Sequence, residues 1–381
     1  MNIAAANAQN REALGAVIGH VICSDTQQPA RLAHVVLEPI ADVQSAPATG
    51  PGYHREGLFH LQTVSLDGSF SIPAVPPGLY YVVAEQEGYI SPLALFTREQ
   101  LGHPDEATLR RIAHYMTSIS VTAGHTTQTE VDLVRGAVIA GTVRFEDGSP
   151  AVNVNVGLLQ RDAKGEWKPV RTQHLASHGS DYTDDQGAYR FSGLPAGEYL
   201  VRASIELNEV IKDHIFSSMG GTSYGDGYRL RIFPGDTFRP RDAKPVKVEE
   251  GENATSVDVD VPLSKLVSVS GIVMRPDSAS TVNAAHLTLN FADGGEEVAS
   301  TDVSADDGSF RFDFVPAGNY VLHATKIATV ERTEVSNGPN TVPPTHTETK
   351  TLARYGDVSM PVQLTTDQSS LIVHATAGKK P

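Results

Sequence analysis

The stretch that decides the fold is DGSFRFDFVPAGNY, which occupies Asp307–Tyr320. Related stretches occupy Asp67–Tyr80 (DGSFSIPAVPPGLY) and Asp185–Tyr199 (DQGAYRFSGLPAGEY). In all three, the closing tyrosine follows the first aromatic residue by ten positions. A match of this length at three places indicates an internal repeat with three copies.

Each copy of the motif predicts two tight turns around a strand. Asp-Gly favours the first turn, because glycine accepts a positive φ and aspartate hydrogen-bonds its own backbone. The alternation that follows, Phe310-x-Phe312-x-Phe314 in the third copy, places the aromatic side chains on one face and the residues between them on the other. We expect the aromatic face to enter a core. Pro-x-Gly forms the second turn, and the strand from Tyr320 onward is expected to bury the same face.

The copies also open and close alike. The opening strands are expected at Ala16–Val21, Ala137–Val143 and Val267–Val273, with Gly19, Gly141 and Gly271 at one register. A glycine inside a strand predicts a bulge or a close backbone approach. Further strands are expected at Ala151–Val156 and His286–Leu289, and closing strands at Ser118–Val121, Glu130–Leu133, Pro245–Val248, Val257–Val261, Val358–Val362 and Leu371–Val373. About seven strands per copy are typical of a two-sheet sandwich. The predicted fold is therefore all-β: three tandem Ig-like or prealbumin-like β-sandwich domains.

The domain boundaries follow from the repeat. We expect a flexible tail over 1–12 and sandwiches over 13–135, 136–264 and 265–377. No linker rich in glycine, serine or proline lies near Arg135 or Ser264. A stiff rod with short hinges is therefore predicted.

The copies differ in one place, where each carries its own insert. In the first copy, residues 104–116 predict a short helix with Leu109, Ile112 and Met116 on one face, packed over a sandwich edge. The second copy has a Gly/Ser/Tyr loop at Ser217–Tyr228. The third has a polar stretch at Glu334–Lys350, expected to be a mobile loop. A specific partner contact is expected in these inserts rather than on the shared hairpin.

Composition excludes several classes of protein. The net charge of -15 argues against a nucleic-acid partner, which needs basic patches. Cys23 is the single cysteine, so an intrachain disulfide and a thiolate metal cluster are both impossible. No apolar run approaches the roughly 20 residues of a transmembrane helix. Ala6-Asn7-Ala8 has the form of a signal-peptidase site without an apolar segment before it. We expect a secreted, periplasmic or cell-surface protein whose signal begins further upstream; the alternative is the polar tail of an intracellular protein.

Together these features resemble the carboxypeptidase regulatory-like domain, a transthyretin-like sandwich. Three features carry the resemblance: the opening strand with its glycine, the Asp-x-Gly-x-aromatic turn and the Pro-x-Gly-x-Tyr turn. The resemblance as a whole covers about half to two-thirds of the chain. The resemblance implies a non-catalytic accessory domain of bacterial secreted and surface proteins, grouped with carbohydrate-binding-like folds. Its partner would be a carbohydrate or another envelope protein, and it implies no cofactor.

Three kinds of chemistry were weighed and set aside. His103-Pro104-Asp105-Glu106 contains the His-x-x-Glu of a zinc hydrolase, but we interpret its acids as a helix start. In collagen-adhesin repeats with isopeptide bonds, a catalytic glutamate occupies positions that match Ala84, Ala203 and Ala324 here. Calcium ligation was considered at two acidic clusters, Asp181/Asp184/Asp185 and Asp302/Asp306/Asp307, which lack EF-hand spacing and are interpreted as turn residues. No catalytic, cofactor-binding or metal-binding residue is predicted.

One ligand site remains as an alternative. Trp167 is the single tryptophan, and sugar sites often use an aromatic face with polar groups nearby. Tyr182, Tyr224 and Tyr228 are its candidate neighbours. Structural cover of a sheet edge is the competing interpretation. The sequence therefore predicts a non-catalytic scaffold or interaction protein, with a carbohydrate-binding protein as the alternative and a zinc-dependent hydrolase as a remote one.

Overall fold

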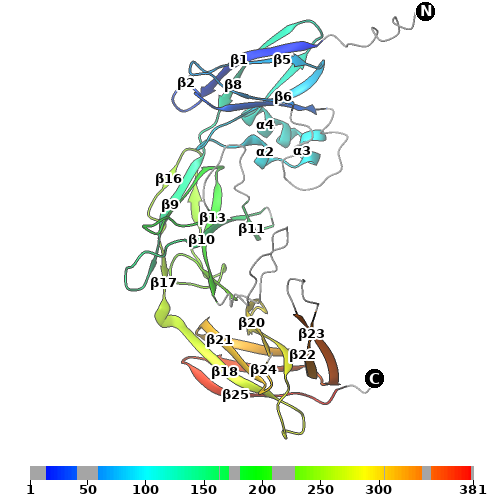
Figure 1. Cartoon of the computed structure of the whole chain (residues 1–381). Helices are drawn as coiled ribbons and strands as arrows, with labels where there is room; N and C mark the ends of the chain where they lie inside the picture. The colour runs from blue at the N-terminus through cyan, green and yellow to red at the C-terminus, as the bar shows by residue number, and fades with distance from the viewer. Residues whose placement is uncertain are drawn as a thin grey trace, which may run out of the picture. The chain divides into compact units, whose positions relative to one another are not determined.

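The computed structural model describes residues 14–40, 59–162, 164–170, 181–207, 228–303, 305–336 and 345–378. The chain is all-β and forms tandem β-sandwiches (Figure 1). It divides into two compact units, residues 1–142 with 157–201 and 244–258, and residues 143–156 with 202–243 and 259–381. This division passes through the second copy of the repeat, so the predicted boundaries of three domains stay a prediction. The tail over 1–12 lies outside the described residues.

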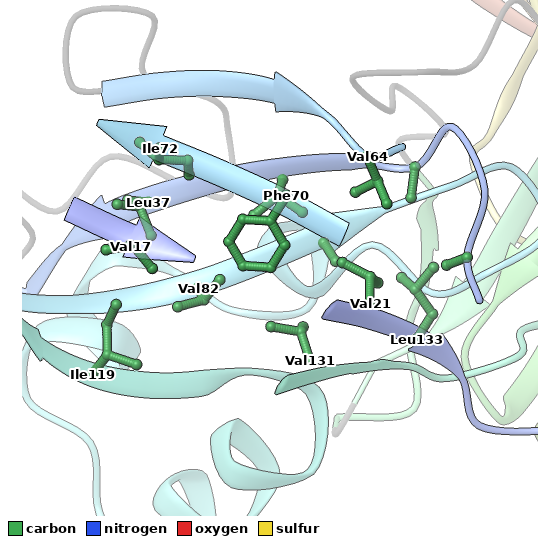
Figure 2. Packing of buried hydrophobic residues seen from close by; sticks show 14 of the residues in the cluster. Val17, Val21, Leu37, Val64, Phe70, Ile72, Val82, Ile119, Val131 and Leu133 are labelled. Carbon is green, nitrogen blue, oxygen red and sulfur yellow. The ribbon is translucent and has the colours of Figure 1, made fainter. Parts of the chain in front are cut away.

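The first sandwich consists of two four-stranded sheets. Its strands are β1 (Gly15–Cys23), β2 (Gln28–Pro29), β3 (His34–Pro39), β4 (Phe59–Thr63), β5 (Ser69–Val75), β6 (Gly78–Glu85), β7 (Thr117–Val121) and β8 (Thr126–Leu133). In one sheet β1 pairs with β2 and β5 antiparallel and with β8 parallel. The other sheet has the order β4-β3-β6-β7. Figure 2 shows the core between them, where Phe70 lies among aliphatic side chains from both sheets.

The second sandwich repeats this topology. Its strands are β9 (Ala137–Phe145), β10 (Asn155–Arg161), β11 (Trp167–Pro169), β12 (Ala188–Leu194), β13 (Gly197–Leu207), β14 (Tyr228–Ile232), β15 (Val246–Val248), β16 (Asn253–Ala254) and β17 (Val259–Val261). β9 pairs antiparallel with β12 and parallel with β16 and β17. The other sheet has the order β11-β10-β13-β14, with β15 also on β13.

The third sandwich follows the same plan after a 3-10 helix, η1 (Leu263–Lys265). Its strands are β18 (Leu266–Met274), β19 (Ala284–Phe291), β20 (Glu297–Val303), β21 (Ser309–Pro316), β22 (Gly318–Ser336), β23 (Thr345–Arg354), β24 (Val358–Leu364) and β25 (Gln368–His374). β18 pairs antiparallel with β21 and parallel with β25. The other sheet has the order β20-β19-β22-β23, with β24 also on β22. Each copy thus has eight or nine described strands rather than about seven, because short strands such as β2 and β16 were not predicted.

The glycine of each opening strand explains why the motif works. Gly141 faces the closing segment so closely that a Cβ there would lie 2.2 Å from the carbonyl oxygen of Val257. The corresponding distances are 2.1 Å from Gly19 to Thr129 O and 2.0 Å from Gly271 to Leu371 O. Each glycine also pairs with the first aromatic residue of the hairpin, which covers it. The predicted close backbone approach is confirmed.

The two turns of the hairpin are held by side chains. In the first turn Asp67 Oδ1 accepts from Ser69 N at 2.9 Å, and Asp307 Oδ1 accepts from Ser309 N at 2.9 Å. In the second copy the accepting residue is Asp184, one position before the predicted Asp185. At the second turn each tyrosine hydroxyl donates to the proline carbonyl four residues earlier, an interaction that the sequence analysis missed; the pairs are Tyr80 with Pro76, Tyr199 with Pro195 and Tyr320 with Pro316.

The alternation within the hairpin strand is interrupted at one shared position. Phe310 and Phe312 are buried, but Phe314 is 47% exposed, so its predicted place in the core is wrong. The register shifts at this point, and Phe314 has a φ of 55°. Ala74 and Gly193 occupy the equivalent positions with φ of 57° and 73°. A bulge inserts an extra residue and turns the next side chain to the other face.

The insert of the first copy is more helical than predicted. It holds α2 (Pro92–Leu95), α3 (Arg98–Gly102) and α4 (Glu106–Tyr115) where one helix was expected. Asp105 caps α4, with Oδ1 accepting from Thr108 N at 2.7 Å, which confirms the helix-start interpretation. The helices cover the outer face of the sheet that contains β6, not an edge, so β6 is buried on both faces (Figure 1). The residues in this second core are Val36, Tyr81, Val83, Phe96, Leu101, Ile112 and Met116.

Two other predicted elements need correction. The strand predicted from Ala151 begins only at Asn155, because Asn153 takes a positive φ of 57° and turns the chain. The polar stretch predicted as a mobile loop is largely a hairpin: β22 runs to Ser336 and β23 begins at Thr345. Threonine alternates along this stretch and favours a strand, although most of the residues there are polar.

Candidate functional sites

The predicted ligand site is only partly described by the structure. Trp167 begins β11, an edge strand of one sheet of the second sandwich. Tyr182 is 49% exposed and precedes β12, which belongs to the opposite sheet. Tyr224 lies outside the described residues. Tyr228 begins β14 in the other compact unit, and its side chain is not described. A shared site around Trp167 therefore stays a prediction.

The surroundings of Trp167 are polar and charged. The guanidinium of Arg161 lies 5.2 Å from the centre of the indole ring, within the range of a cation–π interaction. Arg161 Nη1 is also 3.3 Å from Glu198 Oε2, so this cation is held between a carboxylate and the ring. The two residues that flank Trp167 in the sequence also form an ion pair, with Lys168 Nζ 2.6 Å from Glu166 Oε2. This arrangement combines an aromatic face, already covered in part by arginine, with hydrogen-bonding groups around it.

A second charged cluster was missed by the sequence reasoning. We call Arg239, Arg241, Asp293 and Phe291 the arginine–aspartate cluster. Arg239 Nη1 lies 2.7 and 2.9 Å from the two oxygens of Asp293, and Arg241 Nη2 contacts the same carboxylate. The guanidinium of Arg239 lies 3.4 Å from the centre of the Phe291 ring, and its side chain is only 16% exposed. Desolvation alone would raise the pKa of Asp293, but the arginine hydrogen bonds outweigh it and lower that pKa.

The cluster joins two parts of one compact unit. Arg239 and Arg241 lie between β14 and β15 of the second sandwich, whereas Asp293 lies in the β19–β20 turn of the third. The sequence signal is the run Arg239-Pro240-Arg241-Asp242, which marks a charged loop. The acceptor lies more than fifty residues away, and only the fold could identify it.

Two depressions flank this cluster. The larger is an open groove of about 440 Å³ and the smaller a pocket of about 160 Å³; both are lined in part by Phe238, Phe291 and Pro316. Lys265 Nζ, at the larger groove, is 3.5 Å from Asp236 Oδ2. Ser264, beside it, donates its hydroxyl to Glu146 at 2.6 Å. The backbone N–H of Ser264 also donates to Glu146, at 2.8 Å, so this serine is held by one carboxylate.

The first compact unit contains a related set of contacts. Tyr115 at the end of α4 donates its hydroxyl to Glu250 Oε1 at 2.5 Å, and His114 Nε2 lies 3.4 Å from the other oxygen. Burial, with the Glu250 hydrogen bond, raises the pKa of Tyr115. Near the predicted boundary, Arg135 Nε is 3.0 Å from Asp25 Oδ2 and its guanidinium lies 4.6 Å from the Tyr89 ring. Side chains at the helical insert thus bind the chain of the next copy.

The acidic residues weighed as calcium ligands have partners within the chain. Asp302 Oδ1 lies 2.7 Å from His286 Nδ1, and Asp306 Oδ1 accepts from Asn283 at 3.1 Å. Asp184 and Asp307 act in turns as predicted. The described part of the chain contains no group of three or more His, Cys, Asp or Glu side chains that could hold a metal ion.

The positions weighed for an isopeptide bond are all in the core. Ala84, Ala203 and Ala324 are at most 2% exposed, on the inner face of the strand. Glu85, the neighbouring acid, points to the opposite face, beneath the helices, where it accepts a hydrogen bond from Ser91 Oγ. Glu85 therefore faces away from the core that Ala84 enters. Among the helices that the structure describes, none has the length and hydropathy needed to cross a membrane.

Comparison with known proteins gives only remote structural likenesses. No protein-family model matches the chain, and no curated protein sequence matches it. Among solved structures it is similar to a streptococcal ancillary pilin, with 12% identity, a TM-score of 0.28, and coverage of 96% of this chain and 99% of that one. The minor pilin GBS52 of Streptococcus agalactiae gives 12% identity and a TM-score of 0.27, and the match covers 65% of this chain and 95% of that one. The TIE protein of Bacillus anthracis gives 16% identity and a TM-score of 0.21. The match covers 96% of this chain and 51% of that one, so this chain spans about half the length of that protein.

Proposed function

We propose that the chain is a non-catalytic scaffold of the cell envelope or the extracellular space, built from carboxypeptidase regulatory-like domains. The observation that carries the proposal is the structural role of the repeated residues. The motif glycine allows two strands to approach closely, and the aspartate and tyrosine hydrogen-bond the backbone of the two turns. The repeated residues are thus engaged in holding the fold. Conserving a fold through three copies in this way is what a structural module requires.

Contacts between neighbouring copies support the same role. Tyr115, in the helical insert of the first copy, contacts Glu250, and Arg239, between β14 and β15, contacts Asp293. Hydrogen bonds between arginine and a carboxylate are shorter and stronger than those between neutral groups. Contacts of this kind would hold successive sandwiches in a defined orientation, as a spacer or an assembly subunit needs.

The location can be tested with the chemistry of cysteine. Cys23 is buried, so a membrane-impermeant maleimide should not label the natural chain in intact cells. Leu109 was predicted to lie on the packed face with Ile112 and Met116, but it is on the outer side of α4 and 49% exposed. Leu109→Cys should therefore be labelled if the chain lies outside the cytoplasmic membrane. Labelling of Leu109→Cys only after cell lysis would contradict the envelope location. The natural chain, labelled only when denatured, is the matched control.

A carbohydrate-binding function around Trp167 is the second candidate. It is favoured by the half-buried indole on an edge strand, with Arg161 against the ring and Glu198 bound to Arg161. Because Trp167 is the single tryptophan, its fluorescence reports directly on this surface. Titration with polysaccharides should change that fluorescence if they bind there. No change on titration, or binding on a glycan array that survives Trp167→Ala, would exclude a site at Trp167.

A further inference from the structure

β23 is an exposed edge strand. It pairs antiparallel with β22 along its length, and it ends the order β20-β19-β22-β23 among the strands that the structure describes (Figure 1). All residues of β23 from Thr347 to Leu352 are exposed, and Leu352 is 57% exposed. An edge strand presents backbone N–H and C=O groups that have no partner strand on that side.

The usual protections of an edge are few in β23. The strand is ten residues long and contains neither proline nor glycine. The edge strand β11, in contrast, is three residues long and ends in Pro169. The protection that β23 carries is its charged pair, Glu348 and Lys350. Such charges repel a strand that carries no matching charges, but they admit one that does.

The sequence of β23 matches itself when two copies run antiparallel. If Thr349 lies opposite Thr349 of a second copy, Glu348 lies opposite Lys350 and Lys350 lies opposite Glu348. Thr347 then lies opposite Thr351 on the other face. Directly opposite residues share a face, so both charge pairs are attractive and the threonines meet each other. If the two-fold axis moved by one residue, Glu348 would lie opposite Glu348 or Lys350 opposite Lys350. Like charges that lie directly opposite each other are destabilising, so these registers are disfavoured.

The surroundings allow the pairing. Lys350 Nζ lies 3.9 Å from Glu331 Oε2 on the neighbouring strand, and the Lys350 side chain is 77% exposed. A loose, exposed contact of this kind leaves the ammonium free to turn toward a carboxylate on the other side. Glu331 would then add to the negative field that holds it.

We propose that β23 is a self-association edge through which two copies of this chain form an antiparallel, two-fold symmetric pair, with Thr349 on the axis. The main-chain hydrogen bonds supply attraction, and the Glu348–Lys350 pairs set the register. The inference goes beyond the proposed envelope role and does not depend on it, because pairing is a property of the purified chain.

The test is sedimentation velocity of the full chain, from micromolar to near-millimolar concentration at low salt. The natural chain should dimerise. Glu348→Lys and Lys350→Glu, each alone, should weaken dimerisation at least about tenfold, because two attractive pairs become repulsive. An equimolar mixture of the two variants should form a heterodimer, since each then meets its opposite charges. The doubly swapped chain, Glu348→Lys with Lys350→Glu, should dimerise like the natural one.

The control is Lys168→Glu, which makes the same charge change on the edge strand β11 and should leave dimerisation unchanged. A natural chain that stays monomeric over the whole range overturns the proposal, as does a dimer that either single reversal leaves intact. Dimerisation lost in the single variants and not regained in their mixture overturns the register centred on Thr349. If a single variant fails to fold by circular dichroism, the doubly swapped chain mixed with the natural chain decides the matter. Each should form its own dimer but no mixed dimer, because like charges would meet at both pairs. Mixed dimers as abundant as the pure ones would overturn the register.

Discussion

Replacing Gly141 by alanine tests the close backbone approach on which the repeat depends. The new Cβ would lie 2.2 Å from Val257 O and 3.1 Å from the hydroxyl oxygen of Tyr189. Atoms of this kind do not approach closer than about 3 Å, so the segment that contains Val257 must move outward by roughly 1 Å. Neither neighbour is the end of a flexible side chain that could turn away without cost, because Val257 O is backbone and Tyr189 is buried in the core.

Three of the hydrogen bonds between the displaced segment and this part of the sandwich involve a backbone group. Val257 N donates to Ala140 O at 3.0 Å, Thr142 N donates to Asp258 Oδ1 at 2.8 Å, and the Tyr189 hydroxyl donates to Val257 O. At about 1 kcal/mol each, their loss would destabilise the fold by about 3 kcal/mol. Alanine restricts the unfolded chain and returns about 0.4–1 kcal/mol. The expected net loss of unfolding free energy is therefore about 2–3 kcal/mol.

The assay is urea unfolding followed by the fluorescence of Trp167, which reports on the second sandwich alone. With a urea dependence of about 1–3 kcal/mol per molar, the midpoint should fall by about 1–3 M. Gly148→Ala is the control: its Cβ would meet open space, and only its φ of +84° is unfavourable. That control should cost about 1 kcal/mol. If Gly141→Ala lowers the midpoint no more than Gly148→Ala, the close approach does not restrict residue 141.

Three further outcomes follow from the same contacts. Tyr320→Phe removes the hydroxyl that donates to the carbonyl of Pro316 and should lower the unfolding free energy by about 1 kcal/mol, measured by urea unfolding; an unchanged midpoint would contradict a role for this bond. In a double-mutant cycle, Arg239→Ala and Asp293→Ala should show a small favourable coupling, and the coupling should shrink in high salt because Asp293 is 59% exposed. The hydrogen bonds from Ser309 lower the pKa of Asp307, so its carboxylate stabilises the fold above the ordinary pKa of aspartate and loses that effect as the pH falls through the lowered value. Asp307→Asn should therefore differ from the natural chain at neutral pH and converge with it in acid, as followed by thermal unfolding across pH.

Local geometry explains why the repeated hairpin was predictable. Asp67 and its counterparts define a turn that needs only neighbouring backbone, and a glycine between β-forming residues can serve few purposes other than close approach. Alternation then assigns each residue to a face. These inferences need no knowledge of distant contacts. The structure confirms the glycine approach in all three copies, whereas the turn aspartate is shifted to Asp184 in the second copy and the alternation fails at Phe314 in the third.

The contacts between neighbouring copies were not predictable in the same way. Arg239 is one of many arginine and lysine residues in polar stretches of the sequence. Its sequence neighbours do not distinguish it as the arginine that lies against Phe291. Its partner Asp293 sits in an ordinary Asp-Gly turn, like those that serve only the backbone elsewhere. The pairing depends on where two sandwiches meet, and that is settled by tertiary packing.

Phe314 shows how a local rule can fail for a local reason. A strict period of two assigns it to the core with Phe310 and Phe312, yet the bulge at this position turns it outward. Small residues in the other two copies, Ala74 and Gly193, tolerate the same left-handed backbone with less steric strain. The comparison of copies therefore held the signal: a position that accepts glycine, alanine and phenylalanine cannot be a core position of constant volume. The three copies share the left-handed backbone at this position, and only the third carries a large side chain there. The direction of the Phe314 side chain is therefore set by the bulged backbone that the copies share, and not by a gain from burying the ring.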